Sequence, residues 1–129
     1  GQLAAVQIDS GRILWNREIS SHAGFTVDES YVYLTDDESH IRAFDRFSGS
    51  TIWSNEKLHA RGATGPARVG DYLVVGDMEG FLHWMDRTTG EFVARVQLSG
   101  QRIIVQPFVV GKVLYAYSSD GKLAAFTYR

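Results

Sequence analysis

The sequence predicts an all-β protein, namely a β-propeller fragment of about three four-stranded antiparallel blades. Three observations support this prediction. A unit of short apolar strands recurs at a period of about 41 residues, clusters of turn-forming residues separate the strands, and nothing in the clearest copy of the unit, residues 72–90, resembles a helix. A repeat of about 40 residues is typical of propellers, in which each copy forms one blade.

The repeat is clearest in residues 72–90, which contain two predicted strands and two turns. Tyr72 to Val75 is apolar and β-branched, and residues 76–80 are a cluster of turn formers. A second strand is predicted at 81–86, and residues 87–90 turn the chain again. Equivalent positions recur in one register, with strand starts at Tyr31, Tyr72 and Val113 and turn starts at Asp36, Asp77 and Ser118.

We name the strands of one unit A to D. The chain is then predicted to be one partial β-propeller over residues 1–129, with the C–D hairpin of one blade at 1–19, complete blades at 24–58 and 65–98, and the A, B and C strands of a last blade at 103–127. The A strand of this last blade is predicted over 103–110. Because propellers close with about four to eight blades, the pattern predicts part of a larger ring, cut inside a blade at both ends. Unpaired strand edges would then favour non-native self-association.

The connections between the strands have the residues that such turns require. The C–D hairpins turn at residues 9–11, 47–49 and 88–90, each ending in a glycine that supplies a positive φ. Serine and glycine in the crossing at 20–24 suit a surface connection between blades. Pro66 begins an A strand, where its missing N–H is tolerated.

A tryptophan changes strands between the blades. Two hairpins are predicted to pair a tryptophan on strand D with an alanine on strand C, namely Trp15 with Ala5 and Trp53 with Ala43. In the third hairpin the alanine is on strand D, as Ala94, and the tryptophan is on strand C, as Trp84. A close-packed interior tolerates such a volume-conserving exchange. We therefore predict that Trp84 and Ala94 are cross-strand neighbours.

Composition excludes several classes of function. The net charge of -2 offers no basic surface for nucleic acid or anionic membrane. The chain has no cysteine, which excludes disulfides, thiolate zinc sites and cysteine nucleophiles. No apolar run approaches the roughly 20 residues of a membrane-spanning helix. The sequence therefore predicts neither a nucleic-acid partner nor a membrane-spanning segment.

Metal, cofactor and catalytic motifs are not predicted either. The acidic B–C turns do not have the spacing of a calcium-binding loop, so we expect their carboxylates to bond their own backbone. The histidines are distributed over different strands and connections with no metal-ligand spacing: His22, His40, His59 and His83. His83 alternates with Leu82 and Trp84, which predicts that its side chain lies on the opposite face of the blade.

The repeat resembles that of the PQQ-like β-propellers over the whole chain. The residues that carry this resemblance are Ile41-Arg-Ala-Phe-Asp45, Ser48-Gly49 and Trp53. Within that superfamily, residues 73–84 and 11–18 resemble the C-terminal blades of the BamB family of outer-membrane assembly lipoproteins. The family's lipid anchor and its best-known partner-contacting loops belong to parts that this sequence does not match.

The resemblance implies a function as well as a fold. It implies an eight-bladed ring, attached by a lipid to the periplasmic face of the bacterial outer membrane, that acts as a non-catalytic scaffold in the folding and insertion of outer-membrane β-barrel proteins. The implied partners are the periplasmic POTRA domains of BamA and other subunits of the assembly machinery. Contact with the membrane is implied only through the lipid anchor, and no cofactor is implied.

Two alternatives remain beside the scaffold. A PQQ-dependent quinoprotein dehydrogenase has the same repeat, but that family has a vicinal cysteine pair, calcium ligands and a catalytic aspartate, and this chain has no cysteine. We therefore predict that the protein is not an enzyme. The other alternative is a general protein-interaction propeller of another compartment.

A mixed-charge rim is the predicted binding surface. In a propeller, the D–A crossings and the B–C turns emerge at one end of the blades, so their charged residues are expected to share a surface. The predicted partner-binding residues are Asp36, Asp37, Glu38, Lys57, His59, Arg61, Asp77, Glu79 and Arg102. Such a rim suits protein docking through complementary potentials, although an ordinary solvated surface has the same composition.

Overall fold

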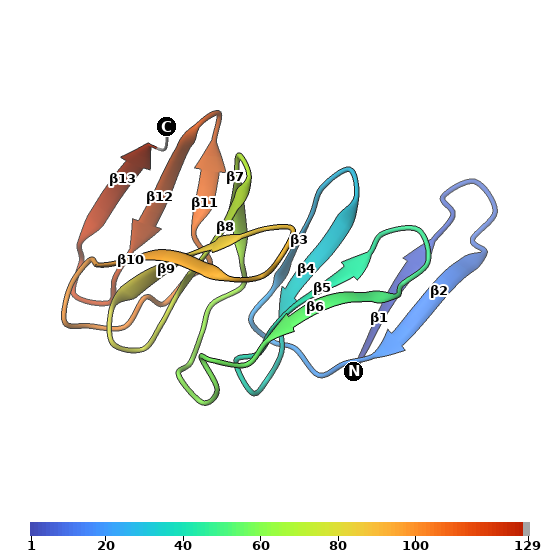
Figure 1. The fold of residues 1–129 in the computed structure, drawn as a ribbon, viewed down its shortest axis with the longest axis horizontal. Coiled ribbons are helices and arrows are strands. Elements are labelled where there is room, and N and C mark those ends of the chain that lie inside the picture. Colours follow the sequence, from blue (N-terminus) through green and yellow to red (C-terminus); the bar gives the residue numbers. More distant parts are fainter. Residues whose placement is uncertain (128–129) are drawn as a thin grey trace.

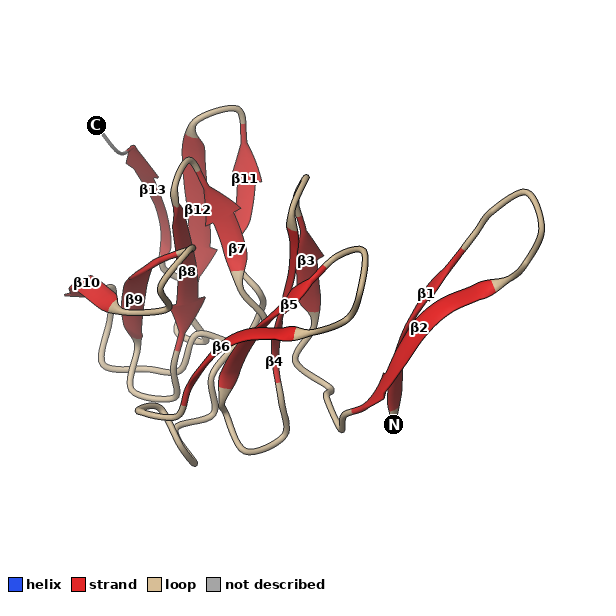
Figure 2. Ribbon diagram, turned by 45° about the vertical axis from the view of Figure 1, so that its right-hand side comes forward, coloured by secondary structure: helices blue, strands red, loops and turns tan. Residues whose placement is uncertain are grey.

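The computed structural model describes residues 1–127, which form antiparallel sheets and no helix (Figures 1 and 2). None of these residues therefore forms a helix that could cross a membrane. The first sheet pairs β1 (Gln2–Val6) with β2 (Ile13–Glu18). The second contains β3 (Phe25–Val27), β4 (Tyr31–Thr35), β5 (Ile41–Asp45) and β6 (Thr51–Asn55).

The third and fourth sheets repeat the same order along the chain. The third contains β7 (Ala67–Val69), β8 (Tyr72–Gly76), β9 (Phe81–Asp86) and β10 (Phe92–Gln97). The fourth contains β11 (Phe108–Val110), β12 (Val113–Tyr117) and β13 (Leu123–Thr127). Within each sheet, every strand pairs with the next one in sequence, and the sheets stand side by side (Figure 2). The predicted all-β propeller fragment is confirmed.

The core lies between neighbouring sheets. Tyr33, Ile41 and Trp53 of the second sheet pack against Leu73 and Met85 of the third, and all five side chains are buried. A second apolar cluster joins the third sheet to the fourth, and its buried members include Val74, Leu82 and Leu114. Both faces of the third sheet are therefore covered, which explains why β8 is a continuous apolar run instead of an alternating one.

The A strand of the last blade is shorter than predicted. The range 103–110 was expected to be strand, but β11 begins at Phe108, and Ile103 makes only an isolated bridge to Ser118. Pro107 has no N–H to donate to a ladder. The backbone N–H of Ile103 instead donates to the carbonyl of Asp77 at 3.0 Å, which ties this crossing to the third sheet.

Tryptophan side chains pack between neighbouring sheets. The indole Nε1 of Trp53 donates to the carbonyl of Arg87 at 2.9 Å, and its ring lies against Gly90. Gly90 has a positive φ of 76°, and a Cβ there would overlap the indole. Trp15 repeats the arrangement one sheet earlier, against Gly49. The glycine that ends a C–D turn therefore also makes room for the tryptophan of the preceding blade.

The predicted exchange of tryptophan and alanine is confirmed in the strand register. Trp84 of β9 faces Ala94 of β10, whereas Trp53 of β6 faces Ala43 of β5. The Trp84 ring packs edge-on against Phe126, with ring centroids 5.5 Å apart. The tryptophan therefore contacts the following sheet from strand C instead of strand D.

A buried carboxylate joins the second sheet to the third. Asp28 Oδ2 accepts hydrogen bonds from the hydroxyl of Tyr33 at 2.6 Å and from Arg87 Nη1 at 3.1 Å, and Oδ1 accepts the N–H groups of Ser30 and Tyr31. Burial opposes ionisation of this carboxyl, but the four hydrogen bonds outweigh it and hold the pKa of Asp28 below its usual range. Burial and the adjacent Asp28 carboxylate raise the pKa of the Tyr33 hydroxyl.

Asp28 is expected to make folding sensitive to acid. A carboxyl with a lowered pKa in the folded state stabilises that state fully above its ordinary value of 3.8, and this stabilisation is lost as the pH falls through the lower folded value. Asp28→Asn should therefore reduce the free energy of unfolding at pH 7 more than at pH 3. Urea denaturation at both pH values measures this difference, and an equal loss at both would contradict the prediction.

Candidate interaction rim

The predicted rim residues lie on connections that meet at one end of the sheets, along the lower edge of Figure 1. We call this surface the lower rim. It is made of the connections at residues 19–24, 36–40, 56–66, 77–80, 98–107 and 118–122. Backbone hydrogen bonds join several of them: Ala60 N–H donates to Glu38 O, and Met78 N–H donates to Arg61 O, each at 3.0 Å. The crossings and the turns therefore form one connected surface.

Asp77 organises the turn between β8 and β9. Its Oδ1 accepts the N–H groups of Glu79 and Phe81, at 2.8 and 3.1 Å, and its Oδ2 lies 2.8 Å from His83 Nε2. The side chain is fully buried. Burial opposes ionisation, but the contacts with His83 and the two backbone groups outweigh it and lower the pKa of Asp77. The expected role of this turn carboxylate, bonding its own backbone, is confirmed.

Arg61 joins the longest crossing to the same turn. Its Nη2 lies 3.5 Å from Asp77 Oδ2 and 3.2 Å from Glu79 Oε1. The guanidinium is about one-third exposed, whereas Glu79 projects into solvent. The basic crossing and the acidic turn therefore lie together, as the predicted topology requires.

The structure divides the predicted rim residues into two groups. Asp77 is buried and Asp36 nearly so, because Asp36 Oδ1 accepts the N–H groups of Glu38 and His40. These two carboxylates support turns and offer little surface to a partner. The remaining side chains reach solvent to different degrees: Asp37, Glu38, Lys57, His59, Arg61, Glu79 and Arg102.

Two histidines that the sequence separates are in contact. His40 Nε2 lies 2.9 Å from His59 Nδ1, although the two residues are 19 positions apart. Glu38 Oε2 lies 3.8 Å from each of these nitrogens. The expectation that the histidines are scattered is therefore wrong for this pair. His40 was not among the predicted rim residues, because no local spacing links the end of a B–C turn to the middle of a D–A crossing.

His83 lies on the face predicted for it. Its ring is near Phe92, which packs against the core between the second and third sheets. Leu82 and Trp84 belong to the core on the other side of the third sheet. The alternation along β9 therefore gives the correct faces, and it delivers His83 to the buried carboxylate of Asp77.

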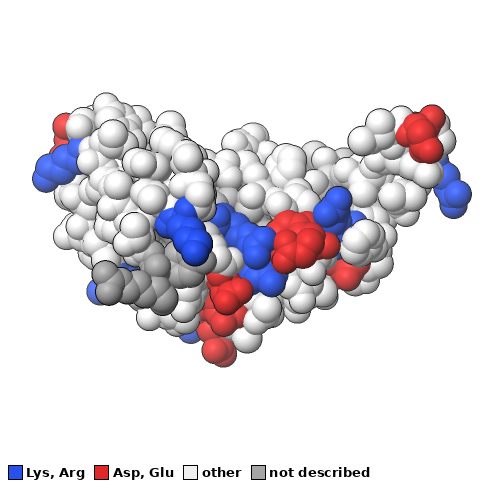
Figure 3. Space-filling view, turned by 90° about the horizontal axis from the view of Figure 1, so that it is seen from above, with Lys and Arg blue, Asp and Glu red and all other residues white. Residues whose placement is uncertain are grey.

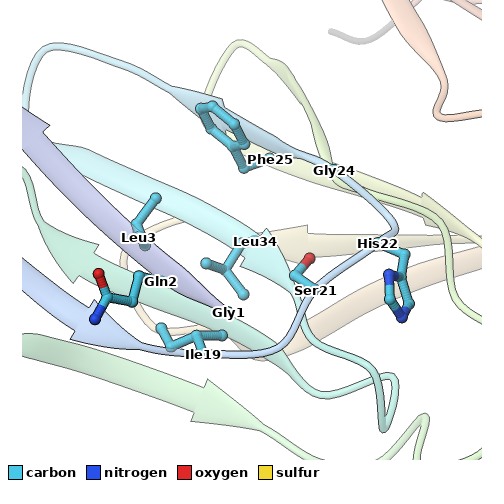
Figure 4. A pocket seen from close by; sticks show the side chains of 9 residues that line it. All are labelled: Gly1, Gln2, Leu3, Ile19, Ser21, His22, Gly24, Phe25 and Leu34. Carbon is cyan, nitrogen blue, oxygen red and sulfur yellow. The ribbon is translucent and has the colours of Figure 1, made fainter.

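A cleft of about 330 Å³ lies between the first hairpin and the second sheet (Figure 4). Leu3, Ile19, Phe25 and Leu34 give it a mainly apolar lining. His22 is the one titratable side chain in this lining, and it lies 3.3 Å from Asp37. The cleft therefore provides a mainly apolar surface with one imidazole at its edge.

A second charged cluster lies at the opposite end of the sheets, and the sequence analysis missed it. Figure 3 shows acidic and basic side chains gathered in the middle of this upper face. Glu29 lies 2.9 Å from Arg68 Nη1 and 3.7 Å from Arg87 Nη2, and Asp71 lies 3.8 Å from Arg87 Nε. These residues come from different turns and strands of two blades. Of these four residues, only Arg87 has a like residue at an equivalent position of the repeat, Arg46.

Comparison with known proteins confirms the resemblance found in the sequence. The family model described as "Outer membrane protein assembly factor BamB" matches residues 1–55 and 37–129. The BamB of Shewanella oneidensis is 42% identical over 127 residues, which cover 98% of this chain and 32% of that protein. The crystal structure of BamB from Moraxella catarrhalis matches with a TM-score of 0.92 at 30% identity, over 99% of this chain and 38% of that one.

Other propellers share the fold at lower identity. A quinohemoprotein alcohol dehydrogenase from Pseudomonas putida HK5 matches with a TM-score of 0.68 at 21% identity, over 80% of this chain and 18% of that one. This likeness shows the fold alone. The chain spans about a third of the length of the curated relatives that it matches, and these are named as outer membrane protein assembly factors. The chain belongs to the BamB family.

Proposed function

We propose that this chain is part of a non-catalytic scaffold that assists the assembly of outer-membrane β-barrel proteins from the periplasmic face of the outer membrane. The family match, which extends over the whole chain, carries this proposal. The quinoprotein alternative has only the shared fold in its favour. Membrane contact in this proposal is made by a lipid anchor outside these residues.

The proposed docking surface is the exposed part of the lower rim, and the proposed partners are the POTRA domains of BamA or another subunit of the machinery. Lys57 and Arg102 add exposed positive charge beside the exposed carboxylates of Glu38 and Glu79. Interspersed charges of both signs give specificity and orient an approaching partner. The buried carboxylates beneath them hold the turns in place, so little conformational freedom is lost on docking.

A chimera tests the proposed function. The matching segment of Shewanella oneidensis BamB is replaced by this chain, and the chimera is expressed in a strain that lacks its own BamB. Restored levels of folded outer-membrane proteins are expected if this segment does the work of its relative. A chimera that is folded and present at normal abundance, yet does not restore these levels, would overturn the proposal.

Reversing the rim charges is expected to weaken docking. In the chimera, Lys57→Glu with Arg102→Glu should reduce affinity for purified POTRA domains by about tenfold, mainly through a slower association rate, since rim charges steer encounter. Surface plasmon resonance at low and physiological salt measures both rates. The matched control reverses two exposed charges at distant turns, Arg12→Glu with Lys112→Glu. An equal loss in both pairs would show that net charge, and not the lower rim, governs binding.

A further inference from the structure

Three side chains on the lower rim are arranged around a common point. Glu38 and His40 come from the turn before β5, and His59 comes from the crossing before β7. The separations are 2.9 Å between His40 Nε2 and His59 Nδ1, and 3.8 Å from Glu38 Oε2 to each nitrogen. The point in the plane of these three atoms that is equidistant from them lies about 2.1 Å from each, which agrees with the Zn–N and Zn–O distances of zinc sites.

We propose that Glu38, His40 and His59 bind a divalent transition-metal cation of the Zn²⁺ type. Two imidazole nitrogens and one carboxylate oxygen are ligands that suit Zn²⁺ and its neighbours, whereas Ca²⁺ and Mg²⁺ prefer oxygen ligands alone. The proposal depends on the geometry of these side chains and not on the scaffold function. A failed test of metal binding would therefore leave the docking proposal unaffected, and the reverse is also true.

The surroundings of His40 favour its role as a ligand. Its other nitrogen, Nδ1, faces Asp36 Oδ2 at 3.6 Å and Glu56 Oε1 at 3.7 Å. Carboxylates on this side favour a proton on Nδ1, so the Nε2 lone pair points to His59, and a cation bound here would replace the hydrogen bond between the two rings. In metal-binding histidines the outer ring nitrogen donates to a carboxylate, carbonyl or water, and the carboxylates of Asp36 and Glu56 lie just beyond hydrogen-bond distance for this role. The acidic groups also add negative potential, which is only partly offset by Arg42, 4.0 Å from Asp36.

The backbone holds the ligands in position before any cation binds. Asp36 Oδ1 accepts the N–H groups of Glu38 at 2.9 Å and His40 at 3.0 Å. His59 N–H donates to the carbonyl of Glu56 at 3.1 Å, and Ala60 N–H donates to that of Glu38 at 3.0 Å. The two segments are therefore joined directly beside the ligands, and binding a cation requires little movement of the backbone.

Three protein ligands leave at least one coordination position open. The side chains of Glu38 and His59 are 66% and 61% exposed, so the open position faces solvent. Water would occupy the open position, and small rotations of these two exposed side chains would be needed to reach the tetrahedral geometry that Zn²⁺ prefers. The bound cation is therefore expected to exchange with solution and to be removable by chelators.

Zinc titration of the purified chain tests the site. After treatment with a chelator, the chain is titrated with ZnCl₂ by isothermal calorimetry, and one Zn²⁺ per chain is expected. His59→Ala should weaken binding by about 100-fold, because one of three ligands is lost. The control is His22→Ala, since His22 is also an exposed histidine next to an acidic side chain, Asp37, and it should bind Zn²⁺ as the unchanged chain does.

A second variant tests the carboxylate ligand. Glu38→Gln keeps the size of the side chain and should weaken Zn²⁺ binding by about tenfold or more, while circular dichroism shows unchanged folding. Binding of Co²⁺ in place of Zn²⁺ should give the visible absorption of a tetrahedral nitrogen–oxygen site. Equal zinc affinity in the unchanged chain and in His59→Ala, or loss of binding only in His22→Ala, would overturn the proposal.

Discussion

Trp53→Ala is expected to lower the free energy of unfolding by about 3–5 kcal/mol, the usual cost of removing a buried tryptophan. Trp53 is only 9% exposed and belongs to the core between the second and third sheets. Its indole N–H also makes the hydrogen bond to Arg87 O that links the two sheets. The substitution therefore removes apolar burial and leaves the carbonyl of Arg87 without this donor. Urea denaturation followed by circular dichroism measures the loss.

The control for this substitution lies one position away on the same strand. Ile52 is 39% exposed and is not among the residues of the core cluster that contains Trp53, so Ile52→Ala should cost much less. Gly90 provides a second check, because a Cβ there would overlap the indole. Gly90→Ala should destabilise the unchanged chain more than it destabilises Trp53→Ala, in which only the strain of a positive φ remains. Additive losses would show that the ring and the turn are not coupled.

The fold was predictable because the same strand starts and the same cross-strand pairs recur in successive copies of the repeat. Tyr31, Tyr72 and Val113 each open the second strand of a sheet, and the tryptophan–alanine pairs identify the register across a hairpin. The prediction of a strand from local residue types was wrong where contacts with another sheet replace the hydrogen bonds between neighbouring strands. Residues 103–105 are apolar and β-branched, yet the N–H of Ile103 donates to the carbonyl of Asp77, in a turn of the preceding blade.

The sequence predicted where the lower rim lies, but it did not predict which of its residues are exposed or in contact. Topology correctly brought Arg61 to Asp77 and Glu79. Charge alone could not distinguish Asp77, which bonds its own turn, from Glu79, which projects into solvent. Nor could spacing pair His40 with His59, because their contact depends on how a turn of one blade meets the crossing to the next. Pairings between separate connections depend on three-dimensional geometry that a repeat period does not contain.

Asp77→Ala is expected to lower the free energy of unfolding by about 3–5 kcal/mol, because it leaves several hydrogen-bonding groups without a partner at about 1–3 kcal/mol for each buried one. The substitution removes the acceptor of the Glu79 and Phe81 N–H groups and leaves His83 buried without its partner. Arg61 also loses a contact, so the crossing at 56–66 should be cleaved faster by proteases. Urea denaturation and limited proteolysis measure the two effects.

Glu79→Ala is the matched control, because Glu79 pairs with the same guanidinium from an exposed position. Exposed ion pairs contribute little, so this change should alter stability by no more than about 1 kcal/mol and leave protease resistance unchanged. Each variant removes one negative charge, but only Glu79→Ala removes it from the solvent-exposed surface. Asp77→Ala removes no solvent-facing group, and any weakening of partner binding would come from a disordered turn and crossing. Equal losses of stability in the two variants would mean that the buried carboxylate does not hold the lower rim together.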